Sequence, residues 1–134
     1  MSWKETYRSR QATAEEAVAH IKSGDRVIVG HACGEPSYLL DVMVQHAEDY
    51  RDVEIVHMVA MGKCEYCKPA YAKNFRHNAI FAGGNSRDAI FEGRGDFTPV
   101  FFYRVPELFD TTLQLDAALV MVTPPGRWDL CRAA

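Results

Sequence analysis

The sequence predicts an α/β fold in which a mostly parallel, doubly wound sheet is flanked by helices. Short apolar runs rich in β-branched residues recur along the chain, and the segments between them have the spacing of amphipathic helices. Twice an apolar run leads through glycines into a helical segment, near residues 27–41 and again near residues 79–91. Strands and helices that alternate in this way form parallel sheets, because each helix returns the chain to the start of the next strand.

The first third of the chain predicts two helices and one strand. Thr13 and Glu16 have the spacing of a capping box, which predicts a helix over residues 13–23. A short β-branched run predicts a strand over residues 26–30. Apolar residues then follow at helical spacing and predict the second helix over residues 37–50.

The middle of the chain predicts two further strands. A mostly apolar run over residues 53–61 is typical of a strand buried on both faces. Residues 63–78 are more polar and predict a loop with a short helix around residues 70–75. Residues 79–82 predict the third strand, and a helix with an Asn or Ser cap follows over residues 85–91.

The last part of the chain predicts a fourth strand or rim segment, a helical turn and a fifth apolar run. The glycines of residues 93–96 end the preceding helix, and residues 99–105 predict a fourth strand or an extended rim segment. Residues 106–109 predict a helical turn, and residues 117–122 form the fifth apolar run, which Pro124 ends. Because such sheets usually continue with another helix, we expect a truncated two-domain protein whose N-terminal domain is residues 1–134.

The composition is that of a soluble globular domain. Of 134 residues, 48% are apolar and 25% are charged, which excludes a disordered or fibrous chain. The net charge of −3 gives no electrostatic reason to expect nucleic acid as a partner. No apolar run approaches the length that spans a membrane, so we expect no membrane partner and a cytoplasmic location.

The four cysteines predict reduced thiols rather than a disulfide framework. They lie at Cys33, Cys64, Cys67 and Cys131, scattered along a chain with an ordinary apolar core. Cys64 and Cys67 form a Cys-x-x-Cys pair, which is compatible with half of a metal site or a redox pair. A metal would need His57 or Cys33 nearby, and an ordinary strand-end loop is the favoured alternative, so no metal is predicted.

The loop between the first strand and the following helix is the candidate binding site. Gly30 and Gly34 allow tight turns, and Pro36 suits the first turn of a helix. Such a junction directs backbone N–H groups and a helix dipole beyond the strand, which favours a carboxylate, phosphate or thioester oxygen. The alternative is an ordinary turn of an α/β sheet. A dinucleotide site is disfavoured because Gly-x-Gly-x-x-Gly is absent.

Five short motifs occur in order along the chain and carry a family resemblance. They are Gly24-Asp25-Arg26-Val27, Gly30-His31-Ala32-Cys33-Gly34-Glu35-Pro36, His57-Met58-Val59-Ala60-Met61-Gly62, Gly84-Asn85-Ser86-Arg87 and Asp96-Phe97-Thr98-Pro99. With them, residues 14–125 resemble the acetyl-CoA hydrolase/transferase family, and within it the amino-terminal domain of the 4-hydroxybutyrate and butyrate:acetate CoA-transferases. Gly95 and Phe97 depart from the family's usual alanine and tyrosine, and residues 126–130 replace its usual glycine-tyrosine turn.

The resemblance implies a CoA-transferase-like domain that binds substrate but lacks the nucleophile. In the family a glutamate of the second domain attacks the acyl-CoA thioester and passes through an acyl-glutamyl anhydride, and no residue here matches it. The implied substrates are a coenzyme A thioester and a small carboxylate such as acetate, with no permanently bound cofactor. The missing C-terminal domain, or a partner subunit that supplies it, is the implied partner, and a homo-oligomer is expected.

Six residues are the predicted substrate-binding set, and no catalytic residue is predicted. The set is Gly30, His31, Gly34, Glu35, Asn85 and Arg87. Arg87 has the chemistry to clamp a carboxylate with two hydrogen bonds, although a solvated or paired arginine is the alternative. His31 is either a proton carrier or a hydrogen-bonded loop histidine. Glu35 is expected to shape the pocket, and a non-catalytic binding or assembly module remains the alternative function.

Overall fold

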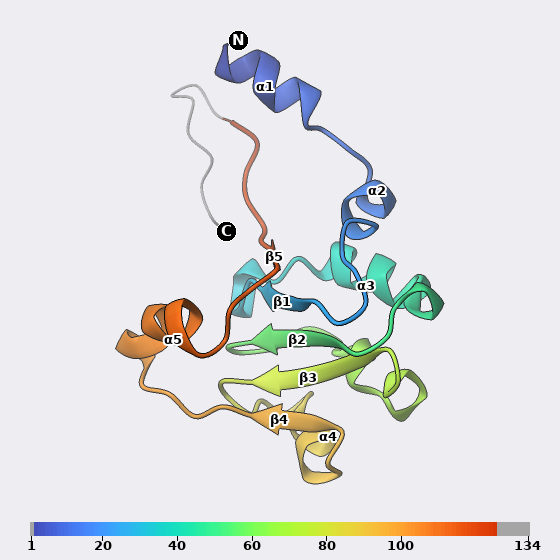
Figure 1. Cartoon of the computed structure of the whole chain (residues 1–134), viewed down its shortest axis with the longest axis vertical. Helices are drawn as coiled ribbons and strands as arrows, with labels where there is room; N and C mark the ends of the chain where they lie inside the picture. The colour runs from blue at the N-terminus through green and yellow to red at the C-terminus, as the bar shows by residue number, and fades with distance from the viewer. Residues whose placement is uncertain (1, 126–134) are drawn as a thin grey trace.

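The computed structural model describes residues 2–125 and contains a five-stranded sheet whose strand pairs are all parallel. The strands lie in the order β4-β3-β2-β1-β5 (Figure 1). Their bounds are β1 Arg26–Val29, β2 Val53–His57, β3 Phe75–Ala79, β4 Gly95–Phe97 and β5 Ala117–Leu119. The predicted parallel α/β sheet is therefore confirmed.

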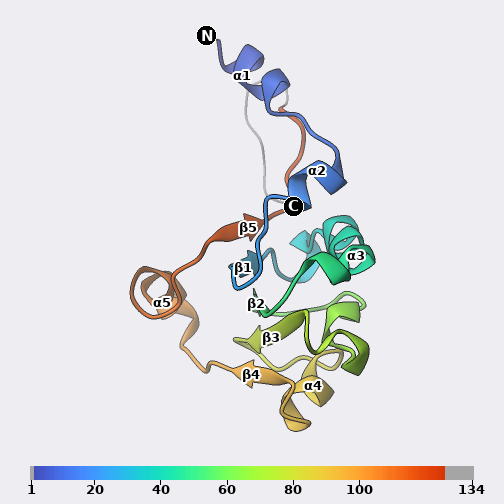
Figure 2. The same cartoon turned by 45° about the vertical axis from the view of Figure 1, so that its right-hand side comes forward.

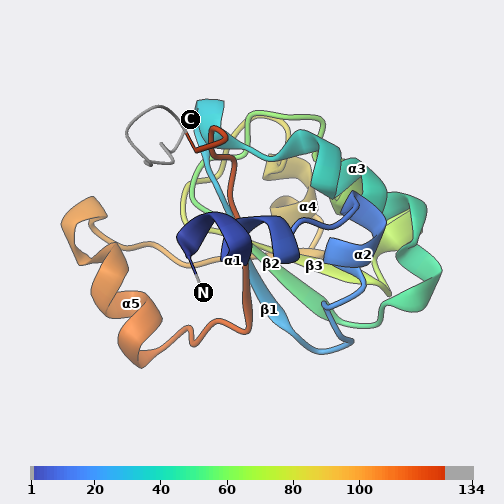
Figure 3. The ribbon, with the colours of Figure 1, turned by 90° about the horizontal axis from the view of Figure 1, so that it is seen from above.

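Helices cover both faces of this sheet, as in a doubly wound fold. The α-helices are α1 Trp3–Ser9, α2 Ala14–Val18, α3 Ser37–Gln45, α4 Arg87–Phe91 and α5 Val105–Thr111. Short 3₁₀ helices are η1 Ala32–Gly34, η2 Ala47–Asp49, η3 Glu65–Cys67, η4 Pro69–Tyr71 and η5 Phe102–Arg104. Helices α3 and α4 lie on one side of the sheet and α5 lies on the other (Figures 2 and 3). The chain winds outward from β1 to β4 and returns through α5 to place β5 beside β1.

The two faces of the sheet bury different sets of side chains. Val27, Val29 and Ile55 point into the larger core, which α2 and α3 complete with buried apolar residues such as Val18 and Met43. The opposite face uses the alternate strand positions, as the two-residue period of a strand requires. There Ile28 and Val56 pack with Val105, Leu108 and Phe109 of α5.

The predicted first helix is shorter in the structure, and an earlier helix was not predicted. The capping box of α2 is present as expected, since Thr13 Oγ1 accepts from the Glu16 N–H and Glu16 accepts from the Thr13 N–H. Helix α1 has a second capping box, formed by Ser2 and Glu5, but none of its residues is buried. A polar sequence with no apolar stripe gave no periodic signal for it.

The third strand lies earlier than predicted. Phe75–Ala79 forms β3, whereas the sequence predicted a loop and short helix up to residue 78 and a strand over residues 79–82. The strand contains His77 and Asn78, which are polar yet buried. Its central position in the sheet overrides the weak local preference of these residues.

The prediction of a strand over residues 99–105 is also wrong. The fourth strand is β4, Gly95–Phe97, in the segment where glycines predicted a break. Residues 99–105 instead form an irregular rim that passes through η5 into α5, close to the extended-rim alternative. The predicted helical turn at Pro106 is confirmed, because Pro106 lies in the first turn of α5. Among residues 2–125 no helix is long and apolar enough to cross a membrane.

Candidate functional site

The loops that follow β1, β2 and β3 meet at one edge of the sheet. All strand pairs are parallel, so the carboxyl ends of the strands lie together. Strand β1 is also the point where the strand order reverses, with β2 on one side and β5 on the other. In open α/β sheets, ligands bind outside the carboxyl ends of the strands at such a switch point.

Glu35 joins the first of these loops to the second. Its carboxylate is buried, and Oε2 accepts from the N–H groups of Met61 at 3.1 Å and Gly62 at 2.9 Å. A Cβ on Gly62 would lie 2.0 Å from Glu35 Oε1, so any other side chain here would push this carboxylate out of its place. Glu35 therefore fixes the Met61-Gly62 turn through two backbone hydrogen bonds, and its role in shaping a substrate pocket stays a prediction.

Asn85 holds the same turn from the third loop. Its Nδ2 donates to the carbonyl oxygens of Met61 at 3.3 Å and Gly62 at 2.8 Å. The turn is thus bound on its N–H side by Glu35 and on its carbonyl side by Asn85. Three loops that are distant in sequence are linked by these two side chains, and Asn85 acts here as a positioning residue rather than as a helix cap.

His57 ends β2 beneath these loops and is fully buried. Its Nε2 lies 3.2 Å from the Gly30 carbonyl oxygen and its Nδ1 lies 3.1 Å from the Tyr66 hydroxyl. Because a carbonyl only accepts, Nε2 carries the proton and Nδ1 accepts from Tyr66. Burial lowers the pKa of His57, while Glu35 at 3.7 Å opposes this effect. From the sequence, the only chemical role predicted for His57 was that of a possible metal ligand. Its buried hydrogen bonds to Gly30 and Tyr66 were not predicted.

Most backbone N–H groups of the glycine loop are already used within the protein. The Gly30 N–H donates to Leu119 of β5 at 2.8 Å, the Ala32 N–H to Val59 and the Gly34 N–H to His31. A Cβ on Gly30 would lie 2.6 Å from the Gly34 carbonyl oxygen, which explains the need for glycine at this position. The expected donation of these N–H groups to an anion is therefore wrong for Gly30, Ala32 and Gly34.

His31 and Met58 line two apolar cavities at the carboxyl edge. A cavity of about 300 Å³ at the switch point between β1 and β5 is lined by Ile28, Val29, Gly30, His31, Gly34, Met58, Phe109, Val120 and Met121. A second cavity of about 270 Å³ is lined by His31, Ala32, Met58, Val59, Ile80, Phe81, Val100, Phe102 and Val105. Three of the six predicted residues, Gly30, His31 and Gly34, thus line cavities. Their apolar partners were not predicted, because α5 and the segment just after β5 supply several of them.

Arg87 lies at the start of α4, at the same edge of the sheet. Its side chain is exposed, and its hydrogen bond to the Ala82 carbonyl is long, at 3.5 Å. Neither of the two cavities is lined by Arg87. The guanidinium therefore retains most of its donors for an anion at the surface of the loops.

The cysteine pair lies beside this site. Cys64 and Cys67 are buried free thiols, whereas Cys33 is exposed. Cys131 lies outside the described residues. Within residues 2–125 no group of three His, Cys, Asp or Glu side chains is arranged to hold a metal ion.

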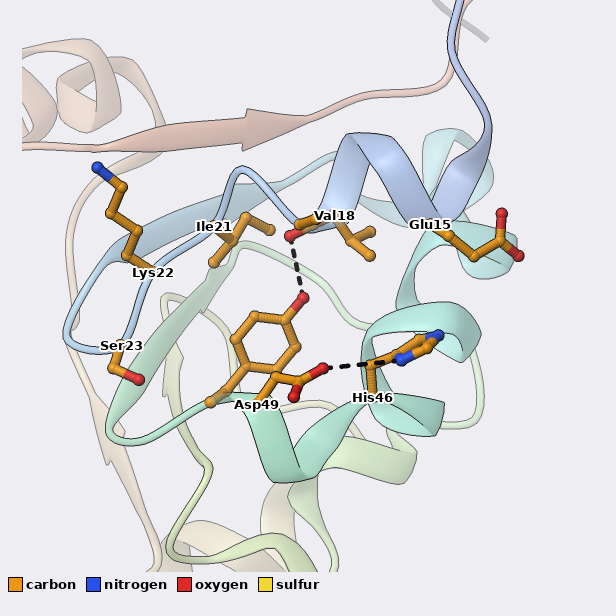
Figure 4. A pocket seen from close by; sticks show the side chains of 9 residues that line it. Glu15, Val18, Ile21, Lys22, Ser23, His46 and Asp49 are labelled. Atoms are coloured by element: carbon orange, nitrogen blue, oxygen red, sulfur yellow. Dashed lines mark hydrogen bonds and ion pairs between the residues drawn. The ribbon is translucent and has the colours of Figure 1, made fainter.

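A cavity larger than these two lies at the other end of the sheet. It measures about 470 Å³ and lies between α2 and the end of α3, lined by Glu15, Val18, Ala19, Ile21, Lys22, Ser23, His46, Asp49 and Tyr50 (Figure 4). The Tyr50 hydroxyl donates to the Val18 carbonyl across it at 2.9 Å. None of the predicted site residues lines this cavity, so its size alone does not make it the candidate site.

Comparison with known proteins shows the family. The model of the acetyl-CoA hydrolase/transferase N-terminal domain matches residues 1–128. The chain is 48% identical over 132 residues to the 4-hydroxybutyrate coenzyme A transferase of Clostridium kluyveri, which covers 98% of this chain. It spans only 31% of the length of that relative.

Two solved structures share the fold. RipA from Yersinia pestis superposes with a TM-score of 0.85 at 21% identity, covering 95% of this chain and 32% of RipA. The 4-hydroxybutyrate CoA-transferase of Porphyromonas gingivalis superposes with a TM-score of 0.70 at 27% identity, covering 97% of this chain and 29% of that protein. The predicted family resemblance is confirmed, and the chain belongs to the acetyl-CoA hydrolase/transferase family, of which it spans the N-terminal domain.

Proposed function

We propose that this chain is the substrate-binding N-terminal domain of an enzyme that moves coenzyme A between 4-hydroxybutyryl-CoA or butyryl-CoA and acetate. The name of the relative that is 48% identical supports a short acyl group. The observation on which the proposal chiefly rests is the pair of apolar cavities at the carboxyl edge of the sheet, which have room for a short acyl group.

The cavities suit a short aliphatic chain that ends near a polar group. Met58, Phe109 and Met121 give the switch-point cavity apolar walls, and His31 adds a polar group to both cavities. Ligand pockets commonly combine apolar walls with a few polar groups that set orientation. Burying each methylene of an acyl chain contributes about 0.8 kcal/mol. A four-carbon acyl group can thus be bound here without any charged contact.

The polar residues divide into two proposed roles. His31 and Arg87 contact substrate, since neither has a strong hydrogen bond within the protein that fixes its side chain. Glu35 and Asn85 are positioning residues, because their polar atoms hold the Met61-Gly62 turn. Gly30 completes the cavity wall, where its missing Cβ lets the loop close on Gly34.

The proposed transfer needs a nucleophile that this chain does not supply. Moving an acyl group off sulfur requires attack on the thioester carbonyl and donors for the oxyanion that forms. Glu35 is the buried carboxylate nearest to the cavities, but two N–H groups already bind one of its oxygens. We therefore assign the nucleophile to the part of the enzyme beyond this chain, and the isolated chain is expected to have no transferase activity.

The first test uses the complete protein that carries this chain. Conversion of butyryl-CoA and acetate to butyrate and acetyl-CoA is measured for Arg87→Ala beside Arg51→Ala, an exposed arginine just before β2 at the opposite edge. A charged hydrogen bond contributes about 1.5 to 3 kcal/mol, so Arg87→Ala should raise the KM for acetate by about 10- to 150-fold. Equal KM values for the two variants would remove Arg87 from the site.

The second test asks whether the domain needs its partner. The chain alone is mixed with the separately produced remainder of the protein, and transfer is compared with that of each part. Restored transfer supports the proposal, since the site is then completed between the parts. Ligand binding by the chain without any transfer in the mixture would instead support a non-catalytic binding module.

A further inference from the structure

We propose that Cys64 and Cys67 are a redox modification site that closes into an intramolecular disulfide on exposure to a hydroperoxide. The proposal concerns the thiols and not the transfer reaction, so it does not depend on the proposed function. It gives a role to the Cys-x-x-Cys motif, which belongs to no metal-binding group among residues 2–125 and lies outside the proposed substrate-binding set.

The backbone already holds the two cysteines at disulfide distance. The Cys67 N–H donates to the Cys64 carbonyl at 2.9 Å, which closes a four-residue turn at η3. Such a turn brings its first and last Cα atoms within about 7 Å, and a disulfide spans about 4.4 to 6.8 Å between Cα atoms. Little backbone movement is therefore needed to form the bond.

The turn is also held in an uncommon conformation. Cys64 has a φ of 48°, in the left-handed region that residues other than glycine rarely adopt. The surrounding fold maintains it, since Arg94 donates a hydrogen bond to the Cys67 carbonyl and the hydroxyl of Tyr66, within the turn, donates to His57 Nδ1. Such local strain is concentrated at sites with a function.

The two thiols are chemically unequal. Interaction with Cys67 lowers the pKa of Cys64, while the same interaction and burial raise the pKa of Cys67. Because Cys64 and not Cys67 lines the small cavity beside Glu35, we assign Cys64 as the thiolate nucleophile and Cys67 as the resolving thiol, in line with these pKa directions. A cavity of about 20 Å³ borders Cys64, beside Glu35 and Lys63, and gives a molecule close to the size of water a place to approach.

Hydrogen peroxide is the only co-reactant that oxidation of the two thiols to a disulfide requires. The Cys64 thiolate attacks one peroxide oxygen, the O–O bond breaks, and a sulfenic acid and hydroxide form. The Cys67 sulfur then attacks the Cys64 sulfur, the S–O bond breaks, and the leaving hydroxide takes the Cys67 proton to become water. The peroxide is reduced to two waters and the dithiol is oxidised to a disulfide.

The test treats the complete protein with hydrogen peroxide under native conditions, then alkylates free thiols and digests with trypsin. Residues 64–73 fall in one tryptic peptide, because the bond between Lys68 and Pro69 resists trypsin. We expect this peptide to lose two hydrogens and to resist alkylation, and dithiothreitol to restore both thiols. Full alkylation of both cysteines after peroxide treatment would overturn the proposal.

Single-cysteine variants test whether Cys64 reacts with peroxide first and Cys67 second, as opposed to unspecific oxidation of any thiol. Cys33→Ser, which removes the exposed thiol, should leave disulfide formation unchanged. Cys67→Ser should leave a sulfenic acid at Cys64 that dimedone traps, and Cys64→Ser should give no dimedone adduct at Cys67. A disulfide that joins Cys33 to either cysteine, or a dimedone adduct at Cys67 in the Cys64→Ser variant, would contradict the assignment. The wild-type peptide decides the main point even if a variant fails to fold.

Discussion

Gly62 lies where the buried Glu35 carboxylate comes closest to the backbone. A Cβ at this position would be 2.0 Å from Glu35 Oε1, and the carboxylate cannot move away without losing its bonds to the Met61 and Gly62 N–H groups. We expect Gly62→Ala to destabilise the fold by about 2 kcal/mol, through overpacking and the loss of charged hydrogen bonds. Urea denaturation midpoints measure this effect.

Gly84 provides the matched control for that prediction. Nothing lies within 4 Å of a Cβ built on it, and its φ is not in the left-handed region. Gly84→Ala should therefore leave stability within about 0.5 kcal/mol of wild type. If the two variants unfolded at the same urea concentration, the Glu35 contact would not matter to the fold.

His77 makes stability depend on pH. It is buried in β3, and neither ring nitrogen makes a hydrogen bond of normal geometry. Burial and the nearby His57 lower the pKa of His77 from 6.5 to about 4, against a smaller opposing effect of the Ile55 backbone. The unfolded chain thus binds a proton that the folded chain does not. Stability should be fully present above pH 6.5 and fall by about 3 kcal/mol as the pH drops to about 4.

Substitution of His77 should remove much of this pH dependence. His77→Leu replaces a buried ring that lacks good hydrogen bonds with an apolar side chain, so stability at pH 5 should rise relative to wild type. His20→Gln, at an exposed histidine, is the control and should follow the wild-type curve. Chemical denaturation at pH 7.5, 6 and 5 gives the slopes. Parallel slopes for His77→Leu and wild type would show that His77 is not the titrating group.

At the scale of elements, a polar ladder crosses the sheet from the start of β1 to the residue just after β4. Arg26 Nε of β1 contacts Glu54 Oε2 of β2 at 2.6 Å, and Glu54 Oε1 accepts from Asn78 Nδ2 of β3 at 2.7 Å. Thr98 Oγ1, just after β4, donates to Asn78 Oδ1 at 2.8 Å. The ladder thus crosses from β1 to the end of β4 and satisfies the buried polar atoms of Asn78.

Asn78→Asp tests this ladder without changing its shape. The substitution removes a donor and places a second carboxylate against Glu54, so we expect a loss of about 1 to 3 kcal/mol at pH 7. Adding Glu54→Gln should recover most of that loss, because its amide donates to the new carboxylate while keeping the size of Glu54. Free energies of unfolding for the four proteins of this double-mutant cycle measure the coupling. Additive effects would contradict a direct contact.

The elements that the sequence predicts well are those with a local signal. Strand β1 and helix α3 follow from a β-branched run and from helical spacing, and the Thr13 capping box marks the start of α2. Strands β3 and β4 were misplaced because their burial comes from neighbours. Asn78 is satisfied by Glu54 and Thr98 of other segments, which no local pattern of residues reveals.

The candidate site follows the same rule: local motifs indicate its residues, but contacts between distant segments cannot be read from the sequence. The family motifs pointed to Glu35 and Asn85, but their shared hold on the Met61-Gly62 turn depends on three loops meeting in space. The glycine loop suggested free N–H donors, and long-range pairing with Leu119 and Val59 uses them instead. Residue types and motifs thus indicated the candidate residues, whereas tertiary hydrogen bonds determine the contacts that Glu35, Asn85 and the glycine loop make.

At the scale of the whole molecule, an aromatic surface remains exposed along the rim between β4 and α5. It comprises Phe97, Phe101, Phe102 and Tyr103, with Phe81 nearby in the cavity wall. The Phe101 and Tyr103 rings stack on each other with centroids 5.9 Å apart, and both are more than 70% exposed. Large exposed apolar patches mark surfaces that a partner covers. The remaining two thirds of the relatives' length is the natural candidate to cover this aromatic surface.

The isolated chain should therefore self-associate through its aromatic surface. Sedimentation velocity should show a weight-average mass that rises with concentration, and Phe101→Ser with Tyr103→Ser should return the chain to a monomer. Trp3→Ser with Tyr7→Ser removes two exposed aromatic rings from α1 and is the control that should still associate. A wild-type chain that stays monomeric at all concentrations would mean that these rings are tolerated in water. In the complete protein, the proposed function predicts that the Phe101 and Tyr103 substitutions weaken transfer, because the part of the enzyme proposed to cover this surface would then pack less tightly.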